Sequence, residues 1–192
     1  MILQSNQAPF PLRSDQALLI AGLLFFILGQ QLLNFGRDFV AAQAPIDYAH
    51  WCLLVGALLF LPFAARLPKR NIHLITIPVF IAGIAAIIGM FVLDFIFWSL
   101  PAGDLADGFY SHVRAEPSIW QVFIAIGPNW VFGTGLALPS LSYFHRSRLG
   151  VALVLIGVLM QPTTGRDLIV VSYALITLGY LMCFNWLRRE EA

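Results

Sequence analysis

Apolar stretches of roughly twenty residues alternate along this chain with short polar segments. An α-helix rises 1.5 Å per residue, so about 20 residues cross the ~30 Å hydrocarbon layer of a membrane. The pattern therefore predicts an all-α integral membrane protein, in which a single polytopic domain forms a six-transmembrane antiparallel helix bundle. The domain covers residues 1–192, and its approximate spans are residues 17–36, 50–65, 74–98, 120–143, 149–164 and 168–187.

The fourth span is interrupted near its middle by residues 127–130 (GPNW) and again by residues 133–135 (GTG). Pro128 has no N–H and removes a helical hydrogen bond, which predicts a kink. Counted from Trp120, Asn129 lies about 9 residues deep, roughly 14 Å along the helix and hence near the middle of the membrane. An unsatisfied carbonyl is costly in hydrocarbon, so the break must face protein or water. Two interpretations follow: a discontinuous helix that offers backbone groups to a solute, or a structural kink whose Asn129 bonds to a neighbouring helix.

Two further features belong to the first span. Gly22, Gly29 and Gly36 recur every seven residues, which predicts a stripe along which another helix approaches closely. Ser14 and Asp15 precede the apolar run and predict the N-cap of its helix.

Composition supports the membrane interpretation and limits the partners. Hydrophobic residues make up 59% of the 192 residues and charged ones 11%, with a mean hydropathy of +0.82 and a net charge of +1. So few polar side chains cannot cover a soluble globule of this size. Nucleic acid is excluded as a partner, because phosphate binding needs clustered Lys and Arg. The expected partners are the lipid bilayer, a small solute or ion, and other chains in a helix-packed homo- or hetero-oligomer.

The basic residues predict the orientation. Lys and Arg in short loops favour the cytoplasm. With six spans and both termini inside, eight basic residues lie in the cytoplasm and three outside, while seven of the ten acids lie on the outer side. This distribution predicts a multi-pass protein of the cytoplasmic (inner) membrane with both termini cytoplasmic. The eight are Arg13, Arg66, Lys69, Arg70, Arg146, Arg148, Arg188 and Arg189, and the three are Arg37, Arg114 and Arg166.

Polar side chains gather at the outer ends of the spans. Asp94 follows Ala82, Ala86 and Met90 at intervals of four residues, so it is expected on a face of small residues that points towards protein. An arginine partner would offset the cost of its charge near the membrane. The alternative is that these residues are helix ends solvated by lipid headgroups. The candidate polar pathway comprises Asn129, Asp94, Arg37, Arg166, Asp167, Gln30 and Asn34.

No cofactor, metal or catalytic residue is predicted. Cys52 and Cys183 fall at opposite membrane faces, and CxxC and HExxH motifs are missing from the sequence. Acids and histidines of the outer segments have no spacing that fixes a metal geometry. They are Asp47, His50, Asp104, Asp107 and His112, the last three in residues 100–118, the longest predicted loop.

Three functions agree with these observations. A small-solute or ion permease with an outward-facing polar vestibule is favoured by the break at Pro128. A non-catalytic accessory or interaction subunit of a membrane complex would use the glycine stripe for packing alone. An intramembrane enzyme is the third, with Ser140 and Ser142 near His145 but without an orienting acid nearby in the sequence.

Overall fold

The computed structural model describes residues 12–67, 71–101, 103–163 and 166–187, and of these it gives only the backbone of Asn71, His73, Arg166 and Asp167. All of its regular structure is helical within these ranges. The helices are α1 (Arg13–Asn34), α2 (Arg37–Ala41), α3 (Tyr48–Leu59), α4 (Leu61–Ala65), α5 (Asn71–Ser99), α6 (Asp104–Ala115), α7 (Pro117–Trp120), η1 (Gln121–Ala125), η2 (Gly127–Val131), α8 (Phe132–Leu141), α9 (Arg148–Met160) and α10 (Arg166–Cys183).

Four helical segments are long and apolar enough to cross a membrane. They are Arg13–Asn34, Tyr48–Ala65, Leu74–Ser99 and Pro117–Leu141. The fifth and sixth predicted spans are also apolar helices, but the described parts, Arg148–Met160 and Leu168–Cys183, are shorter. The prediction of an all-α protein is confirmed within the described residues, and the four long apolar segments fit a helical membrane protein.

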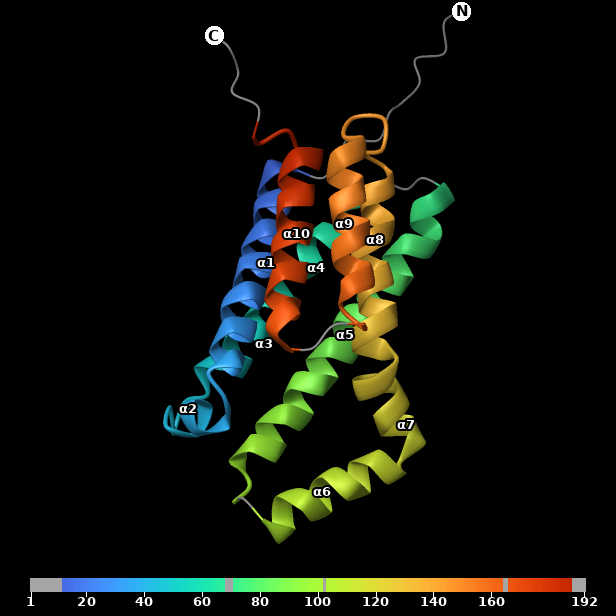
Figure 1. Ribbon diagram of the computed structural model, residues 1–192. Helices are drawn as coiled ribbons and strands as arrows, with labels where there is room; N and C mark the ends of the chain where they lie inside the picture. Colours follow the sequence, from blue (N-terminus) through green and yellow to red (C-terminus); the bar gives the residue numbers. More distant parts are fainter. Residues whose placement is uncertain (1–11, 68–70, 102, 164–165, 188–192) are drawn as a thin grey trace, which may run out of the picture.

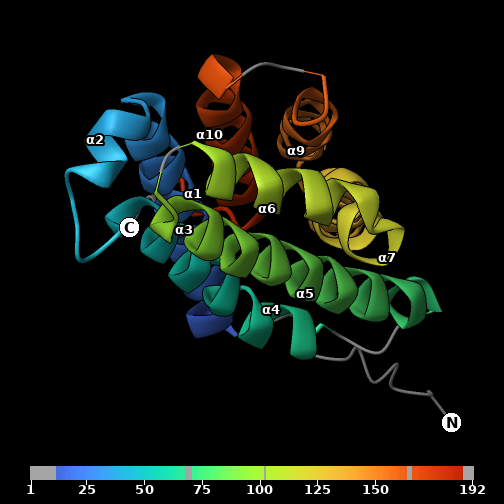
Figure 2. The same ribbon diagram turned by 90° about the horizontal axis from the view of Figure 1, so that it is seen from below.

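The helices form a closed ring. Around it, α1 packs against α3, α3 against α5, α5 against α8, α8 against α9, α9 against α10 and α10 against α1 (Figures 1 and 2). The start of α1, the turn between α8 and α9 and the end of α10 lie at one end of the molecule, which we call the upper end (Figure 1). At the opposite, lower end lie α2 and α6, with α6 running across the gap between α5 and α7 (Figure 1).

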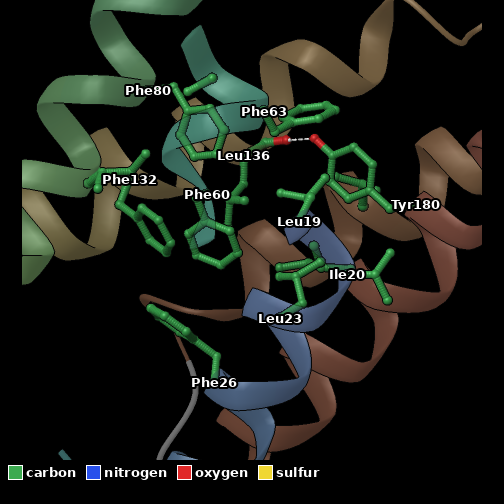
Figure 3. Close-up of a cluster of buried hydrophobic side chains, with 14 of the residues drawn as sticks. Leu19, Ile20, Leu23, Phe26, Phe60, Phe63, Phe80, Phe132, Leu136 and Tyr180 are labelled. Atoms are coloured by element: carbon green, nitrogen blue, oxygen red, sulfur yellow. Dashed lines mark hydrogen bonds between the residues drawn. The ribbon is translucent and has the colours of Figure 1, made fainter. Parts of the chain in front are cut away.

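Aromatic side chains fill the centre of the ring, and five of them form what we call the aromatic core. Phe26 of α1 stands in the middle, with its ring centroid 5.1–5.8 Å from the other four. These four are Phe60, Phe91, Phe132 and Tyr173. Figure 3 shows Phe26, Phe60 and Phe132 together and, above them, the hydrogen bond of 2.5 Å that the Tyr180 hydroxyl donates to the Leu136 carbonyl.

The glycine stripe of the first span is confirmed at two of its three positions. A Cβ on Gly22 would lie 2.7 Å from the Gly56 carbonyl oxygen, and one on Gly29 would lie 2.9 Å from the Ala49 carbonyl oxygen. Both glycines therefore let α1 and α3 approach closely. Gly36 lies beyond the helix, in a turn with a φ of +93° and nothing near its Cβ position.

A second close approach, between α5 and α8, leads to a prediction. A Cβ on Gly83 would lie 2.5 Å from the Cα of Phe132 and 2.8 Å from its backbone nitrogen. Because backbone atoms cannot turn aside, Gly83→Ala must push the two helices apart, at a cost of about 2 kcal/mol. The expected result is a melting temperature lower by about 4–8 °C in thermal unfolding of the purified protein.

The matched control is Gly108→Ala. Gly108 lies inside α6 with nothing within 4 Å of its Cβ position. Alanine stabilises an open helical position by about 0.5–1 kcal/mol relative to glycine, so this variant should melt slightly higher than the wild type. Equal melting temperatures for the two variants would mean that α5 and α8 are not in contact at Gly83.

Two local predictions are wrong. Residues 100–118 contain α6, whereas the sequence predicted a loop from its glycines and prolines. The side chains of Ala106 and Val113 are buried while Leu105 and Tyr110 are exposed, so α6 packs one face against the molecule. The predicted N-cap is also wrong, since α1 begins at Arg13 without a side-chain cap.

Asp15 instead links two helices at the upper end. It is buried, and its Oδ1 accepts a hydrogen bond of 2.9 Å from Nη1 of Arg66, the residue that follows α4. A carboxylate taken out of water needs such a partner, because an uncompensated buried charge is strongly destabilising. The ion pair therefore fastens the start of α1 to the end of α4.

Candidate functional site

A buried histidine, His50, lies in the first turn of α3. Asp47 precedes the helix as its N-cap, and its Oδ1 accepts a hydrogen bond of 3.0 Å from the His50 backbone N–H. The other oxygen, Oδ2, lies 2.5 Å from Nδ1 of the His50 ring. The Asp47 carboxylate therefore caps the helix and holds the imidazole in place. At the start of a helix, a spacing of three residues brings these two side chains together.

A second carboxylate faces the opposite side of the ring. Oδ2 of Asp94, on α5, lies 3.8 Å from Nε2 of His50. The His50 side chain is 2% exposed and that of Asp94 is 32% exposed, so Asp94 stands between the buried ring and the surface. The rings of Phe95 and Trp98 pack against the imidazole at 5.7 and 5.6 Å. We call Asp47, His50 and Asp94 the His50 cluster.

Two carboxylates face the His50 ring from opposite sides, Asp47 at Nδ1 and Asp94 at Nε2. Positive charge close to either carboxylate is attracted to it, and low polarity around the ring strengthens that attraction. Ionisable side chains are costly in such a setting. The arrangement is suited to bind a small cation.

Two cavities flank the His50 cluster at the lower end. One of about 370 Å³ lies between α2, α3 and α5 and is lined by Asp47 and Trp98. The other, of about 230 Å³, lies between α5, α6 and the α7–η1 segment and is lined by Asp94 and Trp98. Each carboxylate of the cluster therefore borders one cavity, and Trp98 borders both.

Comparison with protein-family models, curated protein sequences and solved structures found no match for this chain. The function proposed below is therefore inferred from the His50 cluster and its surroundings. In the described residues, no group of three or more His, Cys, Asp and Glu side chains is arranged to hold a metal ion. Asp104, Asp107 and His112, which the sequence grouped with His50, lie on α6.

The members of the predicted polar pathway have different surroundings. Asp94 has His50 as a described partner, a pairing that the sequence analysis did not identify. Arg37, from α2, lies over the rings of Phe97 and Trp98 at 5.2 and 5.6 Å and so reaches the same region. Gln30 and Asn34 are half-buried on the lower part of α1. The side chains of Arg166 and Asp167 lie outside the described residues.

Asn129 braces the break in the fourth long segment. The break consists of two successive π-helical turns, η1 and η2, with Pro128 in the second. The side-chain Nδ2 of Asn129 donates to the carbonyl of Ala125 at 3.0 Å and to that of Ile124 at 3.3 Å. These bonds supply donors where the proline provides none. The partner of Asn129 is thus its own helix, whereas the packing interpretation of the sequence expected a neighbouring one.

Gln161 leads to a second prediction. Its side chain is buried, its Oε1 faces the Cβ position of Gly133, and neither amide atom has a hydrogen-bond partner among the described residues. A buried amide without partners costs about 1–3 kcal/mol. We therefore expect Gln161→Leu, which keeps most of the volume, to raise the melting temperature by about 2–4 °C per kcal/mol gained. A lower melting temperature would show that the amide has a partner, such as a bound water, that leucine cannot replace.

Sequence reasoning missed the role of His50 and the aromatic residues beside it. The spacing of Asp47 and His50 at a helix start was a usable signal, because an N-cap carboxylate reaches the residue three positions later. No pattern in the sequence indicated that Asp94 approaches His50, since this depends on how α3 and α5 pack.

The enzyme alternative named Ser140 as a possible nucleophile. Its hydroxyl is buried and donates a hydrogen bond of 2.6 Å to the Ala137 carbonyl, so it is engaged within its own helix.

Proposed function

We propose that this protein is a small-solute or ion permease that binds a small cation at the His50 cluster. In this proposal the chain makes six passes through a cytoplasmic membrane, both termini are cytoplasmic, and the lower end faces outward. The outer vestibule contains Asp94 and Arg37 with Gln30, Asn34, Arg166 and Asp167, and the break at Asn129 lies beyond it. The observation that carries the proposal is an imidazole 2% exposed between two carboxylates, each bordering a cavity.

The cost of the cluster supports a functional role. Ionisable side chains at membrane depth are expensive, and they are retained where a proton or an ion uses them. Within the His50 cluster, Asp47 caps the start of α3. A serine or asparagine at position 47 would cap the helix equally well and would need no buried histidine. Stability alone therefore gives no reason to keep His50 and Asp94 together.

The described charges support the orientation. Arg13, Arg66, Arg146 and Arg148 belong to helix ends and turns at the upper end, whereas Arg37 and Arg114 belong to α2 and α6 at the lower end (Figure 1). Basic residues favour the cytoplasmic side, so the upper end is the cytoplasmic one in this proposal. The remaining basic residues of the sequence count lie outside the described side chains.

The aromatic core would act as the barrier. It lies above the His50 cluster, since Phe91 of the aromatic core precedes Asp94 by one helical turn on α5, which runs downward (Figure 1). A cation that reaches Asp94 from the lower end meets the close-packed rings of Phe26, Phe91 and Phe132. Passage then requires the ring of helices to shift, and the π-helical turns at Pro128 are a deformable place within it.

Flux measurements in liposomes test the proposal. Purified protein is reconstituted, and uptake of radiolabelled rubidium and of radiolabelled methylammonium is measured in separate samples against protein-free liposomes. The expected result is uptake of at least one of these cations well above the protein-free rate. Rates equal to those of protein-free liposomes for both cations would contradict the permease.

An accessory subunit is the second candidate, favoured by the packing of the short helices. The apolar stretches of α9 and α10, Arg148–Met160 and Leu168–Cys183, are shorter than the four long segments. Gly150, Gly157 and Gly179 lie in the contact between the two helices. A Cβ on Gly150 would lie 2.7 Å from the Gly179 carbonyl oxygen, and the Ser172 hydroxyl donates to the Gly157 carbonyl at 2.8 Å. A protein built for packing alone would show no flux and would co-purify with a membrane partner.

A further inference from the structure

Half of the side chains that line the cavity beside Asp94 are aromatic. Its volume of about 230 Å³ is bounded by the last turns of α5, by α6 and by the α7–η1 segment. We call five of its lining side chains the aromatic box: Phe97, Trp98, Phe109, Tyr110 and Trp120. Asp94 is the acidic residue among the lining side chains, and the others are aliphatic or Met90.

Contacts between rings hold the walls in place. Tyr110 and Trp120 meet edge to face, with centroids 5.6 Å apart and planes at 89°. Phe97 lies 6.2 Å from Tyr110 and 6.4 Å from Trp98. Edge-to-face pairs at these distances are favourable. Three separate elements, α5, α6 and α7, are thus joined around one space.

The side chains that line the cavity favour one class of ligand. The faces of aromatic rings attract cations, and aromatic cages with a carboxylate are suited to alkylated ammonium groups, which are too weakly hydrated to need oxygen ligands. A bare metal ion would require several oxygen or nitrogen ligands, and this lining offers one carboxylate. A neutral solute of the same shape would gain nothing from Asp94. The box is also hydrophobic enough to accept methyl groups.

The same rings already hold guanidinium groups. Arg37 lies 5.2 Å from the centroid of Phe97, and Arg114 lies 5.8 Å from that of Trp120. Both contacts are within the distance of a cation–π interaction. Neither arginine lines the cavity, so each adds positive charge beside a wall residue without filling the space itself.

We propose that the aromatic box binds a methylated or quaternary ammonium group, with Asp94 as its counter-charge. The group can come from a free solute such as choline or from the choline headgroup of a lipid beside α6. The role of this ligand as the transported cation rests on the proposed function, whereas its binding rests on the cavity alone.

Binding to purified protein tests the inference. The protein is kept in a maltoside detergent without choline and titrated by calorimetry with tetramethylammonium, choline, glycerophosphocholine and the neutral choline isostere 3,3-dimethylbutan-1-ol. The expected result is binding of the ammonium compounds and at least about tenfold weaker binding of the neutral isostere, equivalent to about 1.4 kcal/mol. Choline binding without glycerophosphocholine binding identifies a free solute, and tight glycerophosphocholine binding identifies a lipid headgroup.

Variants locate the bound group. Trp120→Leu and Asp94→Asn should each weaken choline binding by at least about tenfold, within the range expected for a partly buried cation–π contact or ion pair. Arg114→Gln should bind choline at least as tightly as the wild type, because a positive charge beside Trp120 is removed. Trp130→Leu is the matched control, since Trp130 is 56% exposed and does not line the cavity.

Two results would contradict binding of an ammonium group in the aromatic box. One is equal affinity for choline and its neutral isostere, and the other is wild-type affinity for choline in both Trp120→Leu and Asp94→Asn. Circular dichroism and gel filtration establish that each variant is folded, and Trp98→Phe, which keeps an aromatic face, gives a second reading if Trp120→Leu does not fold. Choline binding without flux of rubidium, methylammonium or choline would contradict the permease but not the aromatic box. Flux of rubidium or methylammonium without binding of tetramethylammonium, choline or glycerophosphocholine would contradict the aromatic box but not the permease.

Discussion

Replacing Asp94 by asparagine is expected to reduce cation flux by at least about tenfold while the yield of folded protein stays at the wild-type level. Asparagine has the shape of aspartate but lacks its charge, so the loss corresponds to about 1.4 kcal/mol or more of cation binding. The Asp94 side chain is 32% exposed, and the buried His50 ring keeps Asp47 as a carboxylate partner after the replacement. The measurement is uptake into liposomes, normalised to the amount of folded, inserted protein.

Asn129→Ala is the variant to compare. The Asn129 amide donates to two carbonyls of its own helix, so its removal leaves acceptors unsatisfied and should lower stability by about 1–3 kcal/mol. We expect reduced folded yield from Asn129→Ala and reduced flux per folded molecule from Asp94→Asn. Equal losses of yield in both variants, with no flux above the protein-free rate in the wild type, would favour the accessory-subunit alternative.

Replacing Phe26 by alanine is expected to have the largest effect on stability. Its ring contacts four other rings and is fully buried at the centre of the helix ring (Figure 3). Truncation of a buried phenylalanine leaves a cavity that its neighbours fill only in part, at a cost of about 3–5 kcal/mol. The melting temperature of the purified protein should fall by about 2–4 °C for each kcal/mol.

Phe25→Ala provides the control from the next position on the same helix. Phe25 is 36% exposed on the outer face of α1, so its truncation removes few contacts. Its melting temperature should stay within about 2 °C of the wild type. If Phe25→Ala and Phe26→Ala lowered the melting temperature equally, the face of α1 that points into the bundle would have been assigned incorrectly.

The positions of the apolar helices were predictable because membrane thickness sets their length. The predicted spans at residues 17–36 and 74–98 correspond to helical segments Arg13–Asn34 and Leu74–Ser99. The helix α6 was missed because Gly108 and the flanking glycine and proline residues were taken as breakers. Yet Ala106, Phe109 and Val113 repeat at helical spacing, so the amphipathic pattern of a surface helix was present in the sequence.

The site was less predictable than the helices. Asp94 was identified as a functional candidate from its isolated charge in an apolar span. Asp47 and His50 were grouped with Asp104, Asp107 and His112, whose spacing fixes no metal geometry. The association of Asp94 with His50 requires the start of α3 to lie beside the lower part of α5, a contact between residues more than forty positions apart. One sequence carries no pairing information at that range, whereas the bonds of Asn129 to Ala125 and Ile124 are local and follow from helical geometry.

The proposed function requires the His50 cluster to open to the outer side of the membrane, because the ligand would enter from that side. Cysteine labelling tests it directly. In a chain with Cys52 and Cys183 replaced by alanine, single cysteines are placed at Asp104 on α6 and at Ser147 between α8 and α9, and intact cells are treated with a membrane-impermeant maleimide. We expect Asp104→Cys to be labelled in intact cells and Ser147→Cys only after permeabilisation. Labelling of Ser147→Cys in intact cells, with Asp104→Cys protected until permeabilisation, would contradict it.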